Sequence, residues 1–158
     1  GVMSGLPHIS PELMFLALNF SVLPFWALLV FLPLFKLTDA IVHSVLAPIV
    51  LGVTYAWLFA TALWGATPIP EGAGFGTLDA LIKTFSVKEA LVAGWAHYLV
   101  FDLFIGAWEA RDAQRVGLNH FALIPCLLLT FLVGPIGLLT YLMVRGLTGR
   151  AGWSLFEG

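Results

Sequence analysis

Four long apolar stretches dominate the chain, and each is close to the roughly 20 residues that a helix needs to cross the hydrocarbon core of a membrane. They run from about 12 to 35, 39 to 64, 87 to 108 and 119 to 144. Of all residues 60% are hydrophobic and only 10% are charged, whereas soluble domains average about 45–50% apolar and roughly 25% charged residues. The sequence therefore predicts one integral membrane domain over residues 1–158, an all-α membrane protein with four transmembrane helices in an antiparallel bundle.

Local signals mark the expected helix ends. Ser10 followed by proline is typical of a helix start, Ser86 with Glu89 three residues later predicts a capping box, and Asn119 is the expected cap of the fourth span. A proline- and glycine-rich turn follows the second span. Residues 77–86 come next and carry apolar side chains at helical spacing. We expect this segment to be a short amphipathic helix at the membrane interface.

Charge and cysteine content exclude several classes of protein. The net charge of −2 leaves no basic surface for nucleic acid. The single cysteine, Cys126, excludes an internal disulfide and a cysteine-rich metal site. No cleavable targeting segment is expected.

Short connections make spans one and two, and spans three and four, antiparallel hairpins. Four crossings would place both termini and the long second connection on one side of the membrane.

Two ionisable residues, His97 and Asp102, lie in the apolar part of the third span. An aspartate at the centre of a membrane helix costs at least about 2.5–3.5 kcal/mol. Positions five apart on a helix point about 140° away from each other. Each side chain is therefore expected to find a partner on another helix, or in a ligand or water between helices. We predict a functional role for both, with both turned toward a cavity.

The predicted hairpins also bring polar residues to one end of the bundle, here called the polar mouth. Its members are Asp39, His43, Glu109, Arg111, Asp112, Arg115 and His120. Interfacial salt bridges that hold helix ends would explain the charged residues of the third span equally well. A metal held by the first two of these residues and a third-span ligand is an alternative. No helix carries a paired-histidine spacing such as HExxH, so no metal is predicted.

A second group of side chains is expected to line a ligand. It comprises Trp95, Phe101, Phe104, Trp108, Asn19 and Tyr141. Aromatic side chains at helical spacing can hold an extended apolar molecule between helices. Hydrogen bonds between helices would explain Asn19 and Tyr141 equally well.

The segments WAHYLVFDLF (95–104) and PCLLLTFLVGPIGLL (125–139) resemble the neoxanthin-synthase-like, or abscisic-acid-deficient-4-like, family of membrane proteins. The resemblance covers roughly residues 36–145. Plant members of that family are required for making neoxanthin, a precursor of abscisic acid. They carry a chloroplast transit region, which is not expected in this chain. The chain is therefore expected to be a bacterial member of the inner membrane, cytoplasmic or intracytoplasmic.

The resemblance implies the opening of a 5,6-epoxide on a carotenoid end group to an allene. This chemistry needs an acid for the epoxide oxygen and a base for a nearby polyene carbon. Asp102 and His97 are the candidates, in either order. No redox cofactor is required, because substrate and product are isomers. A carotenoid or other pigment is the expected ligand.

The competing hypothesis is a non-enzymatic subunit that packs pigments or lipids in a larger membrane complex, such as a photosynthetic one. His97 would then be a pigment ligand or a hydrogen-bond donor. The expected partners under either hypothesis are membrane lipids, a carotenoid, and a larger complex or a second copy of the chain. An ion carrier is less well supported, because the fourth span and most of the first offer no carboxylate.

Overall fold

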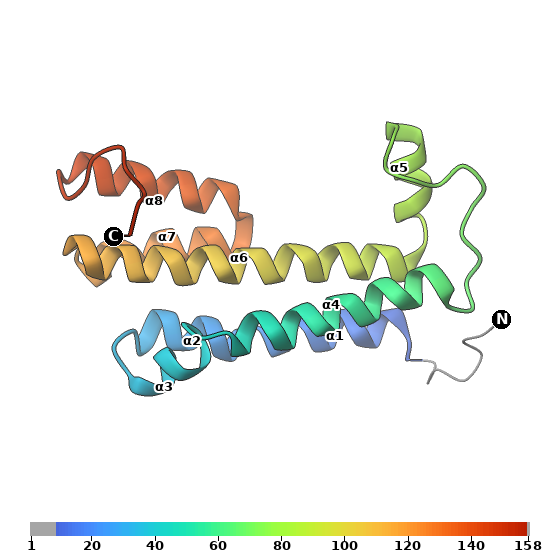
Figure 1. The fold of residues 1–158 in the computed structure, drawn as a ribbon, viewed down its shortest axis with the longest axis horizontal. Coiled ribbons are helices and arrows are strands. Elements are labelled where there is room, and N and C mark those ends of the chain that lie inside the picture. Colours follow the sequence, from blue (N-terminus) through green and yellow to red (C-terminus); the bar gives the residue numbers. More distant parts are fainter. Residues whose placement is uncertain (1–8, 158) are drawn as a thin grey trace. The chain divides into compact units, whose positions relative to one another are not determined.

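The computed structural model describes residues 9–157, and in these residues all regular secondary structure is helical (Figure 1). This confirms the predicted all-α class. The helices are α1 (Pro11–Ser21), α2 (Leu23–Phe31), α3 (Lys36–Ile41), α4 (Leu46–Trp64), α5 (Leu78–Phe85), α6 (Lys88–Val116), α7 (His120–Val133) and α8 (Pro135–Leu147). Three stretches of the described chain are long and apolar enough to cross a membrane, and they are Pro11–Phe31, Leu46–Trp64 and Lys88–Val116.

The helix ends follow most of the predicted signals. Ser10 accepts a hydrogen bond from the backbone N–H three residues later, and Asn119 accepts one from the N–H two residues later. The predicted helix at 77–86 is α5. The capping box at Ser86 is wrong, because its hydroxyl donates to the carbonyl of Lys83 at 2.6 Å and so ends α5 instead of starting α6.

The first two predicted spans are each interrupted. The first breaks at Val22, between α1 and α2, and the second is not helical between α3 and α4. Pro24 and Pro48 lie in the first turns of α2 and α4. Proline lacks an N–H and clashes with the carbonyl four residues earlier, so a helix is easier to start at a proline than to continue through it. The prediction of one continuous helix from 39 to 64 is therefore wrong.

The third predicted span is longer than expected. It forms α6, which continues to Val116 where the prediction ended near 108. Figure 1 shows it as one uninterrupted helix. The added turns contain the charged residues that were expected to mark the end of the span. They remain helical because several of their side chains are paired by neighbouring helices, as described below.

The fourth predicted span, 119–144, is wrong as a single helix. It divides at Gly134, whose φ of 21° and ψ of −86° interrupt the helix, and α7 and α8 fold back on each other. Gly137 of α8 packs directly on the backbone of Thr130 in α7. The two helices have 14 and 13 residues. At 1.5 Å per residue each is roughly 20 Å long, short of the ≈ 30 Å hydrocarbon core.

Contacts divide the described residues into two compact units. The first contains α1, α4 from Ile49 onward, α5 and α6 as far as Val100. The second contains α2, α3, the first residues of α4, α6 from Phe101 onward, α7 and α8. Each unit is described separately.

In the first unit, α1 and α6 run parallel and in register. Lys88 Nζ lies 2.6 Å from Glu12 Oε1, and the indole N–H of Trp95 donates to Asn19 Oδ1 at 2.7 Å. Both contacts join residues 76 positions apart, so the two helices keep the same offset over two turns. The start of α1 therefore lies beside the start of α6.

In the second unit, α2 and α7 pack on the second half of α6. Gly106 of α6 faces the ring of Trp26, to which an added Cβ would come within 2.5 Å. The same ring packs against Phe131 of α7, with ring centres 5.3 Å apart. The imidazole of His120 lies 2.7 Å from the carbonyl of Val30 and joins the start of α7 to the end of α2.

Candidate functional site: an apolar groove and a buried polar layer

An open groove of about 610 Å³ lies in the first unit, between α1, the end of α5 and the start of α6. Its wall is almost entirely apolar. The lining residues are Pro11, Glu12, Phe15, Phe85, Lys88, Leu91, Val92, Gly94, Trp95 and Tyr98. Small-molecule sites typically have volumes of roughly 300–1,000 Å³ and are lined mainly by hydrophobic and aromatic side chains. The groove has both properties.

Aromatic rings shape this groove. Trp95 stacks on Tyr98 with ring centres 5.1 Å apart, and Phe15 of α1 lies 5.7 Å from the Trp95 ring. Phe85 of α5 closes one wall by packing on Gly94, where an added Cβ would come within 2.8 Å of the ring. The prediction that Trp95 lines a ligand site agrees with this geometry, although the groove itself was not foreseen.

Few polar atoms reach the wall of the groove. The indole N–H of Trp95 is taken by Asn19, so the ring offers the groove only its apolar surface. Glu12 and Lys88, which begin α1 and α6, form an ion pair at 2.6 Å with side chains 64% and 71% exposed. They are the charged residues of the lining. The charged ends of Glu12 and Lys88 are therefore largely exposed and contribute little to the wall of the groove, which is apolar almost throughout.

His97 does not face the interior. It is exposed, and its ring makes an edge contact with Tyr55 of α4, with ring centres 5.7 Å apart. The prediction that this imidazole turns toward a cavity is wrong, because the buried face of α6 in the first unit is formed by small and aliphatic residues, among them Ala93, Ala96 and Leu99.

Asp102 is buried in the second unit, with 8% of its surface exposed. Its carboxylate lies directly against Gly134, at the turn between α7 and α8, where any side chain would collide with it. This position is the N-terminal end of α8, where the helix dipole favours a negative charge. Asp102 is thus buried against the turn between α7 and α8, and its predicted orientation toward a cavity stays a prediction.

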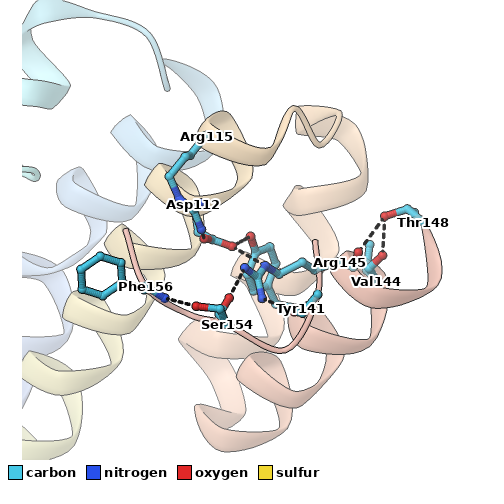
Figure 2. Close-up of polar contacts among 9 residues, drawn as sticks. Asp112, Arg115, Tyr141, Val144, Arg145, Thr148, Ser154 and Phe156 are labelled. Carbon is cyan, nitrogen blue, oxygen red and sulfur yellow. Dashed lines mark hydrogen bonds and ion pairs between the residues drawn. The ribbon is translucent and has the colours of Figure 1, made fainter. Parts of the chain in front are cut away.

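A buried polar layer centred on Asp112 joins α6 and α8 in the second unit (Figure 2). The hydroxyl of Tyr141 donates to Asp112 Oδ2 at 2.5 Å, and Arg145 Nε lies 2.8 Å from the same oxygen. Arg115 forms an ion pair with the other carboxylate oxygen. Asp112 is 1% and Arg145 4% exposed, so this pairing belongs to the interior and not to an interfacial rim.

Glu109 lies one turn earlier on α6 and is fully buried. The hydroxyl of Thr130 in α7 is 2.9 Å from both carboxylate oxygens. Together with Asp102 and Asp112, Glu109 places three carboxyl groups on the part of α6 that α7 and α8 cover. An ionisable residue at membrane depth is a candidate for function unless its pairing explains it.

The predicted polar mouth separates into several sites. Arg111 lies 3.1 Å from the Nδ1 of His43, while Asp39 is exposed. Burial lowers the pKa of His43, the positive charge of Arg111 lowers it further, and Asp39 opposes both. Asp112 pairs with Arg115 and His120 contacts α2, as given above. All seven residues lie in the second unit, where they form separate contacts and not one cluster, and their grouping at one mouth stays a prediction.

The remaining predicted ligand residues do not share the groove. Phe101 and Phe104 are exposed residues of the second unit. Trp108 packs edge-on against Tyr141, with ring centres 5.7 Å apart. Tyr141 is fully buried and engaged by Asp112. For Tyr141, the alternative of a hydrogen bond between helices is the one that the structure supports.

Sequence reasoning missed Arg145, Thr130 and the groove pair Glu12 and Lys88. Arg145 was assigned no role from the sequence. Its place four residues after Tyr141 on one helix face was an available signal. Its guanidinium also donates to the carbonyls of Gly152 and Ser154, at 3.2 and 2.9 Å, and so holds the C-terminal segment (Figure 2).

Comparisons with known proteins assign the chain to a family. The family model described as ABA DEFICIENT 4-like matches residues 13–141. The chain is 30% identical to the Arabidopsis thaliana protein ABA DEFICIENT 4, chloroplastic, over 137 residues, which cover 80% of this chain and 58% of the relative. It therefore spans a little over half the length of that relative. No solved structure matches the chain.

Proposed function

The chain belongs to the ABA DEFICIENT 4-like family, and from this membership we propose that it is a carotenoid-handling membrane protein whose first unit holds the polyene. The observation that carries the proposal is the groove along α1 and α6, with a volume of about 610 Å³ and an almost wholly apolar wall. Stacked rings such as Trp95 and Tyr98 suit a flat conjugated chain. Because the groove is open, a long molecule can continue beyond it into lipid.

Purification in mild detergent from a carotenoid-producing host tests this binding. The protein is expected to carry a stoichiometric pigment, seen in its absorption spectrum. A Trp95→Ala variant should lose most of that pigment because the stacking surface is removed. Trp57→Ala is the matched control, since Trp57 is also an exposed tryptophan of the first unit but does not line the groove. Equal pigment in wild type and Trp95→Ala would contradict the assignment of the groove.

The finer proposal is an isomerisation of a carotenoid 5,6-epoxide to an allene. An acid protonates the epoxide oxygen as its bond to the carbon next to the polyene breaks. A base removes a proton from the adjacent polyene carbon, and the electron pair left there forms the second double bond of the allene. One proton enters and one leaves, so no oxidant or reductant is needed. Asp102 and His97 are the proposed acid and base, in either order.

A feeding experiment tests the reaction separately from binding. Wild-type protein is given a 5,6-epoxy xanthophyll such as violaxanthin, and the product is followed by chromatography. Asp102→Asn and His97→Gln keep the size of each side chain while removing its acid–base chemistry. Each is expected to abolish product while the pigment stays bound. Undiminished conversion by both variants would exclude this pair as the catalytic groups.

A non-enzymatic pigment-packing role is the second candidate function. The exposed position of His97 favours it, because an acid–base pair on one helix would normally face a shared substrate. Stoichiometric pigment that is never converted, together with unchanged pigment content in Asp102→Asn, would support this role over the isomerase.

A further inference from the structure

Glu109 of α6 is a buried carboxyl group to which the proposed function assigns no role. It is fully buried in the second unit, and its side chain is hydrogen-bonded to Thr130 of α7. Among residues 9–157, no lysine, arginine or histidine nitrogen lies within ion-pair distance of its carboxyl oxygens. An isolated charge in such a place is so costly that a carboxyl group takes up a proton instead. These contacts therefore favour a neutral carboxylic acid.

The charges along α6 do not favour a carboxylate at this position either. Asp102 interacts electrostatically with Glu109, and Asp112 lies one turn further along the helix. The guanidinium groups of Arg115 and Arg145 both pair with Asp112, and Nη1 and Nη2 of Arg145 donate to carbonyls of the C-terminal segment. Both cations are therefore committed to other acceptors, while the neighbouring acids would repel a negative charge on Glu109.

The remaining ionisable groups around this part of α6 supply no positive charge to Glu109. Cys126 of α7 and Tyr141 of α8 interact electrostatically with it, but a thiol and a phenol are neutral at about pH 7. His120 of α7 faces a carbonyl of α2, and Arg111 of α6 faces the imidazole at the α3–α4 connection. Helix α2 has no ionisable side chain. No neighbouring helix therefore offers Glu109 a counter-charge within the described chain.

The distances between Glu109 and Thr130 describe a closed pair of hydrogen bonds. Thr130 Oγ1 lies 2.9 Å from each of the two carboxyl oxygens. A hydroxyl has one hydrogen to donate and can also accept a hydrogen bond. If the acid is neutral, its O–H donates to Thr130 Oγ1 while the Thr130 hydroxyl donates to the carbonyl oxygen of the acid, so each donor has an acceptor. An ionised carboxylate has about four acceptor sites, and this hydroxyl would leave most of them empty.

We infer that Glu109 is a proton-binding site of the second unit, in which a proton taken from water is held between the carboxyl group and the Thr130 hydroxyl. The site depends on the covering helix α7, because hydration of an uncovered carboxyl group would let it ionise. It gives the second unit an acid separate from Asp102 and His97. It also does not depend on what occupies the groove of the first unit.

Infrared spectroscopy of the purified full chain tests the site directly. The carbonyl stretch of a neutral carboxylic acid absorbs at a higher frequency than amide and carboxylate bands, and a detergent without carbonyl groups leaves that region free. Exposed glutamates are ionised at about pH 7 and do not contribute there. The difference spectrum between wild type and Glu109→Gln is expected to show a neutral-acid band equivalent to about one carboxyl group per chain.

Matched variants assign this band. Glu89→Gln is the control, because Glu89 lies on the same helix and also accepts from a threonine hydroxyl, but it is not buried. This variant should keep the band, and so should Asp102→Asn. Thr130→Val keeps the shape of the side chain without its hydroxyl. It should move the band to higher frequency without removing it, because the acid stays neutral and loses its hydrogen bonds.

Thermal unfolding in the same detergent gives a second measurement. The amide of Glu109→Gln has a donor and an acceptor where the neutral acid has them, so this variant is expected to unfold at the temperature of wild type. Asp112→Asn makes the corresponding change one turn away, at a carboxylate that forms ion pairs. It should unfold at a lower temperature, because its buried cation loses the counter-charge.

The outcomes decide between a proton on Glu109 and the alternatives. A wild-type protein without the neutral-acid band, or a band that Glu109→Gln leaves in place, overturns the inference. A band removed only by Asp102→Asn assigns the proton to Asp102 and also overturns it. If Glu109→Gln fails to fold, Thr130→Val decides, since an unmoved band would exclude the Glu109–Thr130 pair. None of these results bears on carotenoid binding, so the proposed function stands or fails separately.

Discussion

Gly134 shows how one residue shapes the second unit. It occupies a position with φ of 21°, and its missing side chain leaves room for the carboxylate of Asp102. Helix α8 begins at the next residue, and the dipole at its N-terminus favours the negative charge of Asp102. The turn, the buried acid and the start of α8 thus depend on one glycine.

Replacing this glycine should be costly. Gly134→Ala is expected to destabilise the fold by about 1–3 kcal/mol, because a side chain there meets both an unfavourable backbone angle and the carboxylate of Asp102. Gly146→Ala is the control, since that helical glycine has open space around it and alanine favours helices. Thermal unfolding in detergent measures both. A Gly134→Ala protein as stable as wild type would contradict the geometry of this turn.

His43 is expected to make the α3–α4 connection sensitive to pH. Its ring accepts from Arg111, and its folded-state pKa lies below the ordinary value of 6.5 because of burial and the Arg111 charge. Because the pKa of His43 is lower in the folded protein than in the unfolded chain, the imidazole binds a proton more readily when the protein is unfolded. Its contribution to stability is therefore complete above about pH 6.5 and is lost as the pH falls further.

Hydrogen exchange of the segment around residues 41–45 measures this effect. Exchange should accelerate between about pH 6.5 and 5 in wild type, because protonation of the imidazole removes the acceptor that Arg111 uses. In His43→Asn the exchange, corrected for its intrinsic pH dependence, should stay level. Equal pH profiles for the two proteins would show that another group controls this connection.

At the scale of elements, α6 is the helix on which both units are built. Its first half pairs with α1 through two contacts in register, and its second half carries the buried carboxyl groups that α7 and α8 cover. The straightness of α6 agrees with the absence of proline from its sequence. The predicted spans that divide all contain proline, although α7 continues through Pro125.

The Asp112 site should dominate the packing of α8 on α6. Asp112→Asn is expected to cost about 3–5 kcal/mol of stability, because it leaves the guanidinium of Arg145 buried without its counter-charge. Asp79→Asn on the exposed surface of α5 is the matched control and should change stability little. Chemical denaturation in detergent provides the comparison. Equal loss in both variants would indicate that Arg145 is held mainly by the C-terminal carbonyls.

At the scale of the whole molecule, the hairpin of α7 and α8 changes the expected topology. Both helices are too short to cross the membrane, and their turn at Gly134 reaches Asp102, midway along α6. The pairing of Tyr141 with Asp112 returns α8 toward the end of α6. Such re-entrant backbone is tolerated at membrane depth where protein covers it. We therefore expect three crossings, at the three stretches that are long and apolar enough to span a membrane, in place of the four that were predicted.

Cysteine labelling tests this topology. In a Cys126→Ser background, Glu71→Cys probes the connection before α5 and Arg150→Cys probes the segment after α8. Because α6 crosses the membrane once between them and the hairpin does not cross, a membrane-impermeant thiol reagent should reach the two positions from opposite sides. Labelling of both from the same side would restore the four-span arrangement.

The sequence by itself determined the properties that depend on local composition. Long apolar stretches favour membrane-embedded helices whichever helices they pack against. The caps at Ser10 and Asn119 form hydrogen bonds within one helical turn, so they depend on local sequence alone. The W-x-H-x4-D and GP-x-G segments likewise identified the family. Only the tertiary structure decided that 119–144 folds back, that His97 is exposed, and that Arg145 pairs with Asp112. These features depend on which helices pack together, and the hydrophobic pattern of a membrane helix does not distinguish a neighbouring helix from lipid.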